Sequence, residues 1–220
     1  DDDGEPGLHL STLDGRCDLI GAGMTAGRLQ VNGDAGDAVA QGMQGGQLTV
    51  TGDCGDLAGS GLVDGTLRIH GQAGDGVGAP PGGQRQGQRG GLIHISRPCG
   101  ERAGEAMRRG VLLIEGHCGR LLGHRMIAGT IVVGGQAGAW PGYGMRRGTI
   151  VLTRAPETLP PTLQSNGRLY LSFLSLLIDQ LNTGAGKDLG LQQPAGGVLR
   201  WLGDAACHGQ GELLILEKST

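Results

Sequence analysis

Residues 110–129 read Gly-Val-Leu-Leu-Ile-Glu-Gly-His-Cys-Gly-Arg-Leu-Leu-Gly-His-Arg-Met-Ile-Ala-Gly, and they span one unit of a repeat that is nineteen residues long. From its first glycine the unit is Gly-x-Leu/Ile-x-Val/Ile-x-Gly-x-x-Gly, followed by a mixed stretch and Met-x-x before the next glycine. Copies begin at Gly27, Gly46, Gly65, Gly91, Gly110, Gly129 and Gly148. All five methionines share one position of the repeat: Met24, Met43, Met107, Met126 and Met145. Self-similarity at a fixed period indicates stacked structural units.

Each copy contains one short stretch in which apolar residues alternate with others, as in a strand that buries one face. These pairs are Leu29/Val31, Leu48/Val50, Leu67/Ile69, Ile93/Ile95, Leu112/Ile114, Ile131/Val133 and Ile150/Leu152. Glycines interrupt the rest of each unit, so no helix fits there. The sequence therefore predicts an all-β domain over residues 1–155, a right-handed parallel β-helix of about six to seven coils. One copy carries a seven-residue insertion within residues 76–89, because the step from Gly65 to Gly91 is 26 residues.

Cysteine and methionine are expected to fill the core of this solenoid. Cys54, Cys99 and Cys118 share a repeat position with alanines in other copies, and Cys17 joins them in the divergent first copy. A position that accepts cysteine or alanine calls for a small apolar side chain, so packing is predicted in place of metal binding or disulfides. The methionine position is interpreted in the same way.

The histidines are not expected to share a site. His70 and His94 fall at outward-facing positions in or beside strands, while His117 and His124 fall in the glycine-rich arc of one coil. Metal-binding spacings of the C-x-x-C or H-x-x-x-H type, a G-x-S-x-G turn, paired carboxylates and an aromatic platform on one face are not found. We therefore expect no catalytic residue and no metal ligand in this chain.

Arginines mark one edge of the predicted solenoid. Met-Arg-Arg-Gly occurs at 107–110 and again at 145–148, two coils later, and one arginine precedes the methionine of the coil between. The five residues are Arg108, Arg109, Arg125, Arg146 and Arg147. A ladder of guanidinium groups suits a polyanion or a carboxylate-rich partner. The alternative is a set of salt bridges, to Glu101, Glu105 and Glu115 or to another subunit.

Residues 156–220 form a C-terminal extension of different character. Prolines at 156, 160 and 161 mark a linker, residues 169–181 form an apolar run of helix length, and residues 212–217 are strand-like. The extension is expected to cap the open end of the solenoid or to dock on another subunit. Net charge is −3, which gives no field for nucleic acid, and no apolar stretch of eighteen residues or signal peptide is found. We expect a cytoplasmic protein without membrane contact.

The repeat resembles the glycine-rich β-helix that the third subunit of formylmethanofuran dehydrogenase shares with the C-terminal domain of the glutamate synthase large subunit. The ending Gly-Asp-Ala-Ala-Cys-His-Gly-Gln-Gly-Glu at 203–212 is similar to the G-D-x-x-x-x-G-x-G-E ending of the family of that third dehydrogenase subunit. The arginine-rich, lysine-poor composition looks more like the bacterial branch of that family, the formyltransferase/hydrolase complex. The open alternatives are the third subunit of a molybdenum or tungsten dehydrogenase and a glutamate synthase-type structural β-helix.

The resemblance implies a scaffold role in a hetero-oligomer, without catalysis by this chain. Formyltransferase, amidohydrolase-like and pterin-enzyme-like subunits would be its partners. The complex would transfer formyl from tetrahydromethanopterin to a methanofuran analogue and hydrolyse it to formate, with zinc held in another subunit. The arginine edge would then meet a polyglutamylated one-carbon carrier.

Overall fold

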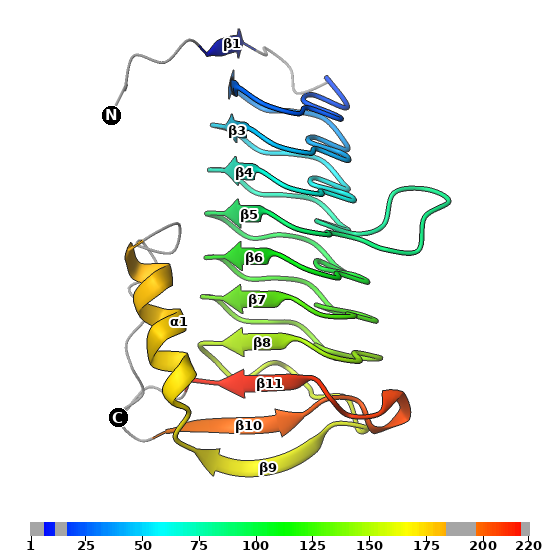
Figure 1. The fold of residues 1–220 in the computed structure, drawn as a ribbon, viewed down its shortest axis with the longest axis vertical. Coiled ribbons are helices and arrows are strands. Elements are labelled where there is room, and N and C mark those ends of the chain that lie inside the picture. Colours follow the sequence, from blue (N-terminus) through cyan, green and yellow to red (C-terminus); the bar gives the residue numbers. More distant parts are fainter. Residues whose placement is uncertain (1–6, 12–16, 184–196, 217–220) are drawn as a thin grey trace.

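A computed structural model gives the structure of the chain and describes residues 7–11, 17–183 and 197–216. Within these residues, one sheet of eleven strands runs the length of the molecule (Figure 1). Its parallel part consists of β1 (Leu8–Ser11), β2 (Arg28–Asn32), β3 (Gln47–Val50), β4 (Thr66–Ile69), β5 (Leu92–Ile95), β6 (Val111–Ile114), β7 (Thr130–Val133) and β8 (Thr149–Leu152). Each strand pairs with the same position of the next repeat, as Leu112 does with Ile131. The predicted parallel β-helix is confirmed.

The inward side chains of the strands build the core of the solenoid. Leu48, Leu67 and Ile93 stack in successive coils and are fully buried. Four of the five methionines are also fully buried, and Met24 packs against the same core. Because a fully buried aliphatic side chain contributes roughly 1.5–3 kcal/mol, these ladders are the main stabilising term of the fold. The methionine position is core, as predicted.

The turn opposite the sheet depends on a left-handed backbone at alternate positions. In one coil Leu57, Gly59 and Gly61 have φ of 61°, 67° and 64°. Glycine adopts this conformation without strain, whereas other residues do so at a cost. The predicted insertion leaves the solenoid between β4 and β5 as a projecting loop (Figure 1).

The C-terminal extension caps the solenoid by joining its sheet. β9 (Gln164–Leu169), β10 (Val198–Leu202) and β11 (Glu212–Ile215) close one end of it. The last of these, β11, pairs parallel with β8, so that Leu213 and Ile215 extend the two core columns. β10 and β9 follow with antiparallel pairing. The predicted strand-like tail is confirmed for residues 212–215, while residue 217 lies outside the described residues.

Helix α1 (Ser172–Thr183) lies along the outer face of the sheet, not over the end of the solenoid (Figure 1). Leu174 and Ile178 pack there on the outward side chains of Leu113, Val132 and Val151. The helix overlaps the apolar run expected over residues 169–181 but begins three residues later, because Leu169 ends β9, and β9 to β11 provide the cap.

The Gly-Asp ending has a structural explanation in Asp204. This residue is only 1% exposed, and its Oδ2 accepts a hydrogen bond of 2.8 Å from the backbone N–H of Gly144. In the coil before, the N–H of Arg125 donates to the carbonyl of Tyr143. The carboxylate of Asp204 therefore replaces a carbonyl of the coil that would have come next. Its Oδ1 accepts from the N–H of Ala206 at 2.9 Å and caps a short 3-10 helix, Ala205–Cys207.

Candidate functional site

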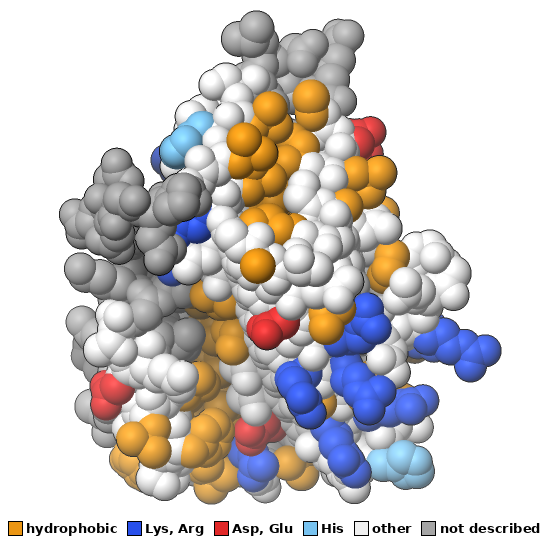
Figure 2. Space-filling model, turned by 45° about the horizontal axis from the view of Figure 1, so that its top comes forward, with side chains coloured by type: hydrophobic (Ala, Val, Ile, Leu, Met, Phe, Trp, Pro, Cys, Tyr) orange, Lys and Arg blue, Asp and Glu red, His pale blue; other side chains and the backbone are white. Residues whose placement is uncertain are grey.

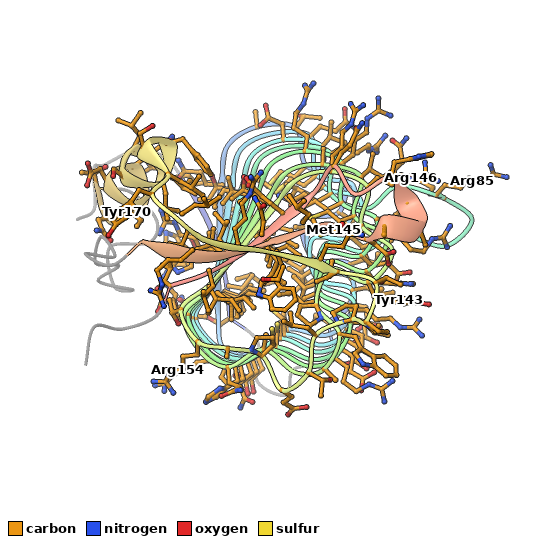
Figure 3. The ribbon with its side chains drawn as sticks, turned by 90° about the horizontal axis from the view of Figure 1, so that it is seen from below. Arg85, Tyr143, Met145, Arg146, Arg154 and Tyr170 are labelled. Atoms are coloured by element: carbon orange, nitrogen blue, oxygen red, sulfur yellow. The ribbon has the colours of Figure 1, made fainter. Side chains whose placement is uncertain are left out.

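The five predicted arginines are all exposed, and the backbone register stacks them as expected. The N–H of Arg108 donates to the carbonyl of Gln88, and the N–H of Arg146 donates to the carbonyl of Met126 in the same geometry. Since β6, β7 and β8 are neighbours, the two Arg-Arg pairs lie two coils apart, about 10 Å along the solenoid. Figure 2 shows basic side chains gathered on one face beside the insertion loop. In the view along the solenoid, Arg146 and Arg85 lie on the same side (Figure 3).

The carboxylates that were candidates to neutralise this edge bind other residues. Glu101 lies 4.0 Å from the guanidinium of Arg120. Glu105 and Glu115 contact histidines, at 3.2 Å from His124 Nδ1 and 2.7 Å from His94 Nε2. Among the described residues, none of these three glutamates forms an ion pair with the five arginines, so the alternative of salt bridges within the chain is not found, while salt bridges to another subunit stay open.

Only one guanidinium of the predicted edge has a hydrogen bond among the described residues. Arg147 Nε donates to Gln210 Oε1 at 2.8 Å, which links the last coil to the capping segment. For Arg108, Arg109, Arg125 and Arg146, no ion pair or side-chain hydrogen bond is found within the part of the chain that the structure describes. An edge of exposed, unneutralised guanidinium groups attracts anions.

Arg89 belongs to the same edge, although the sequence analysis did not include it. Its N–H donates to the carbonyl of Leu62, which is the register that Arg108 and Arg146 show one and three coils later. The signal was present, because Arg89 stands two residues before Gly91 as Arg108 stands before Gly110. Arg89 was missed because the insertion precedes it and no methionine marks its place in the repeat. The methionine position of this coil holds Gln88, which is fully buried.

A groove beneath the insertion loop adjoins the arginine edge. It has a volume of about 980 Å³ and is lined on one side by residues 79–85 of the loop. Arg85, Arg102 and Arg125 border it together with Asp56 and Asp75. The two aspartates each accept a backbone N–H of the next coil through Oδ1, both at 2.7 Å. They are thereby part of a carboxylate ladder that holds coils together.

An aromatic cluster lies at the neighbouring corner, where the sequence analysis expected none. Trp140 and Tyr143 are 45% and 44% exposed, with ring centroids 6.5 Å apart. His124 stacks on Tyr143 at 6.0 Å, and the Arg120 guanidinium lies 5.9 Å from the Trp140 ring. His124 and Tyr143 share one repeat position in successive coils, so the register brings them together, whereas Arg120 and Trp140 stand at offsets that differ by one residue.

Three of the five cysteines are packing residues, as predicted, whereas Cys17, which was expected to join them, is exposed. Cys54, Cys99 and Cys118 are buried in a column of backbone bridges with the alanines of other copies, and no disulfide joins them. Burial raises the pKa of the Cys54 thiol to about 12, with the carboxylates of Asp53 and Asp34 adding to the effect. Burial also raises the pKa of Cys118 to about 12, against a lowering by the N–H of Gly138. The thiols therefore stay protonated at neutral pH and make poor nucleophiles.

The histidines have separate partners. His117 Nδ1 accepts a backbone N–H from Gln136 at 2.9 Å, whereas His124 binds Glu105, so the two do not share a ligand. His94 lies on the outer face of the sheet, as expected, but it is only 4% exposed and paired with Glu115. Among the described residues, no group of three or more His, Cys, Asp or Glu side chains is arranged to hold a metal ion. None of the helices in that part of the chain is long and apolar enough to cross a membrane.

Comparisons with known proteins identify a relative of this chain. No protein-family profile matches the sequence, and no curated protein matches it. Among solved structures, a chain of the formyltransferase/hydrolase complex (FhcABCD) from Methylorubrum extorquens, determined in complex with methylofuran, is 38% identical. The match covers 97% of this chain and 79% of that chain, with a TM-score of 0.85. Identity at this level over nearly the whole chain shows common descent, and the chain therefore belongs to the family of that component of the formyltransferase/hydrolase complex.

Proposed function

We propose that this chain is the third of the four subunits of a formyltransferase/hydrolase complex, and that it serves there as a non-catalytic scaffold. The complex transfers formyl from tetrahydromethanopterin to a methanofuran analogue and hydrolyses it to formate, with zinc in another subunit. The observation that carries the proposal is the match along 97% of the chain to a component of such a complex. A continuous sheet with a dry aliphatic core also suits a rigid support, because each coil is fixed by backbone bonds to both neighbours.

The test of the complex is affinity purification of the tagged chain from its native host, with mass spectrometry of the bound proteins and metal analysis of the eluate. Recovery of a formyltransferase and a zinc amidohydrolase-like subunit is the expected result. A molybdenum- or tungsten-pterin subunit would instead assign the chain to a dehydrogenase. Glutamate synthase components, or no partner at all, would overturn the proposal.

The arginine edge is proposed to bind the carboxylate-rich chain of the one-carbon carrier. The solved relative contains methylofuran in its complex, and a polyglutamyl chain on such a carrier would present carboxylates in series. Arg108, Arg109, Arg125 and Arg146 offer exposed guanidinium groups that the described part of the chain leaves unneutralised. Coil spacing of about 4.8 Å gives a ladder with a short, regular repeat. Many weak charge contacts along such a ladder sum to a binding energy that falls with ionic strength.

The edge is tested by replacing Arg108, Arg109, Arg146 and Arg147 with alanine in the assembled complex. We expect carrier affinity to fall at least tenfold at low salt, with a weaker salt dependence than wild type and intact assembly. Arg154→Ala is the matched control, because Arg154 is also exposed but lies on the opposite side of the solenoid in the view along it (Figure 3). If carrier affinity stayed unchanged, or if only assembly were lost, the arginines would belong to a subunit interface and the proposed carrier site would be refuted.

A further inference from the structure

The corner formed by Arg120, His124, Trp140 and Tyr143 carries large exposed side chains where the backbone gains nothing from them. Trp140 has a φ of 62°, in the left-handed region that glycine tolerates best. The same repeat position holds Ala38, Leu57, Gly76, Arg102 and Leu121 in other coils, with the same left-handed φ. The turn therefore accepts side chains of different sizes and does not itself require a tryptophan. A large aromatic side chain that stays half exposed at this position points to a partner that covers it.

The composition of the corner is that of the centre of a protein interface. Tryptophan, tyrosine and arginine are the residues most enriched at binding hot spots, and here all three are in contact. His124 is held on one side by Glu105 and on its face by Tyr143. The aromatic rings are thus fixed before any partner arrives, which lowers the entropy lost on binding.

The charge around the corner specifies the partner. Arg102 and Arg125 are exposed beside it and have no ion pair among the described residues. The nearby carboxylates are occupied, since Glu105 contacts His124 and Glu101 lies near Arg120. The surface that remains is apolar at its centre and positive at its rim.

We infer that this corner docks another protein subunit, through a contact surface that is apolar at its centre and bears carboxylates around it. The inference rests on the proposed function, because that function supplies the subunits. A complementary rim of opposite charge would orient the partner, while the buried aromatic rings would supply most of the affinity. The half-exposed rings of Trp140 and Tyr143, tilted by 38° to each other, offer an apolar contact area that the arginine edge lacks.

The test uses the complete complex, obtained by co-expressing the tagged chain with all other subunits from the same host. Trp140→Gly should weaken retention of one subunit about 30-fold or more, the effect of losing a hot-spot residue. The unfolding midpoint of the isolated chain should fall by no more than about 5 °C, because glycine relieves the left-handed strain. Leu19→Gly is the matched control: Leu19 is also exposed and has a φ of 57° at the same repeat position, several coils away. It should leave assembly unchanged.

A charge pair of variants tests the chemistry of the partner. Trp140→Glu should weaken the contact more than Trp140→Arg, by about tenfold, if the partner's rim is acidic. Equal losses of subunit retention in Trp140→Gly and Leu19→Gly, or normal assembly of Trp140→Gly, would overturn the inference. Weaker carrier binding by Trp140→Gly with all subunits retained would also overturn it. If the wild-type chain recovered none of these subunits, the proposed function would fail instead, which separates the two outcomes.

Discussion

Replacing Asp204 by alanine is expected to loosen the C-terminal cap. The carboxylate is buried and accepts two backbone N–H groups, from Gly144 of the last coil and from Ala206 of the 3-10 helix. Alanine removes both acceptors. The N–H of Gly144 then has no acceptor, because no further coil follows to supply a carbonyl. The N–H of Ala206 is exposed and can donate to water instead.

The size of the effect follows from these two bonds. A hydrogen bond to a charged group contributes about 1.5–3 kcal/mol, and a buried donor left alone costs about 1–3 kcal/mol. With the Ala206 bond discounted for solvent, the free energy of unfolding should fall by about 2–4 kcal/mol. Asp204→Asn keeps one carbonyl oxygen and should lose about half as much. Asp179→Ala, on the exposed side of α1, should stay within about 0.5 kcal/mol of wild type.

Urea unfolding followed by far-UV circular dichroism measures the free energy of unfolding of the three variants. Hydrogen exchange measures the protection of the Gly144 amide directly. In Asp204→Ala that amide should exchange faster, together with the amides of β11. If the free energy of unfolding changed by less than about 0.5 kcal/mol and Gly144 stayed protected, the capping role of Asp204 would be refuted.

Four further perturbations test the core and the sheet faces. Met126→Ala empties a fully buried position and should cost about 2–5 kcal/mol in urea unfolding. Stability should fall as pH rises from 9 to about 12, by about 1.4 kcal/mol per unit for each of Cys54 and Cys118, because the unfolded thiols ionise first near 9.0. In chemical denaturation at these pH values, Cys54→Ala should remove its share of the slope. Gly148→Ala should cost about 1–3 kcal/mol in the same assay, since φ is 95° and its Cβ would lie 2.9 Å from the carbonyl oxygen of Gly129. Val132→Asp should release α1 to limited proteolysis, because the charge would lie unpaired beneath the helix.

The repeated part of the fold could be predicted because a single register fixes every coil. Once the glycines and methionines were aligned, the inward pairs, the column shared by Cys54 and Cys118, and the site of the insertion all followed. Each prediction needed only local information, since every coil contacts the next one in the same way. The solenoid is confirmed for this reason.

The placement of the extension needed a signal of another kind. The outward positions Leu113, Val132 and Val151 are apolar, whereas the same column holds Arg68 and His94 earlier in the chain. A strand that is apolar on both faces indicates cover on both faces. This change marks where α1 lies on the sheet, but the sequence analysis used only the inward residues. The strand order β8, β11, β10 was not predicted either, because β11 comes from the C-terminal end of the chain and not from the segment that follows β8.

For the arginine edge, the sequence predicted the positions but not the partners. Position along the solenoid depends on register, whereas an ion pair depends on the direction of each side chain within a turn. Glu101 and Glu105 lie four residues apart in one coil, and they contact Arg120 and His124 of the next coil at the same repeat positions. Partners thus follow the columns, and a search along columns would have found these pairs.

Charged side chains have different surroundings in the early and in the later coils of the solenoid. In the early coils, carboxylates such as Asp37 and Asp56 accept backbone N–H groups at 2.7–2.8 Å, so that acidic side chains join successive turns. In the later coils, the exposed arginines Arg108 and Arg146 have no such task within the described residues. These arginines extend outward, and the same coils carry the aromatic corner around Trp140. The two proposed binding surfaces therefore lie toward the end that the C-terminal cap makes rigid, which is where a docked partner would be held in one orientation.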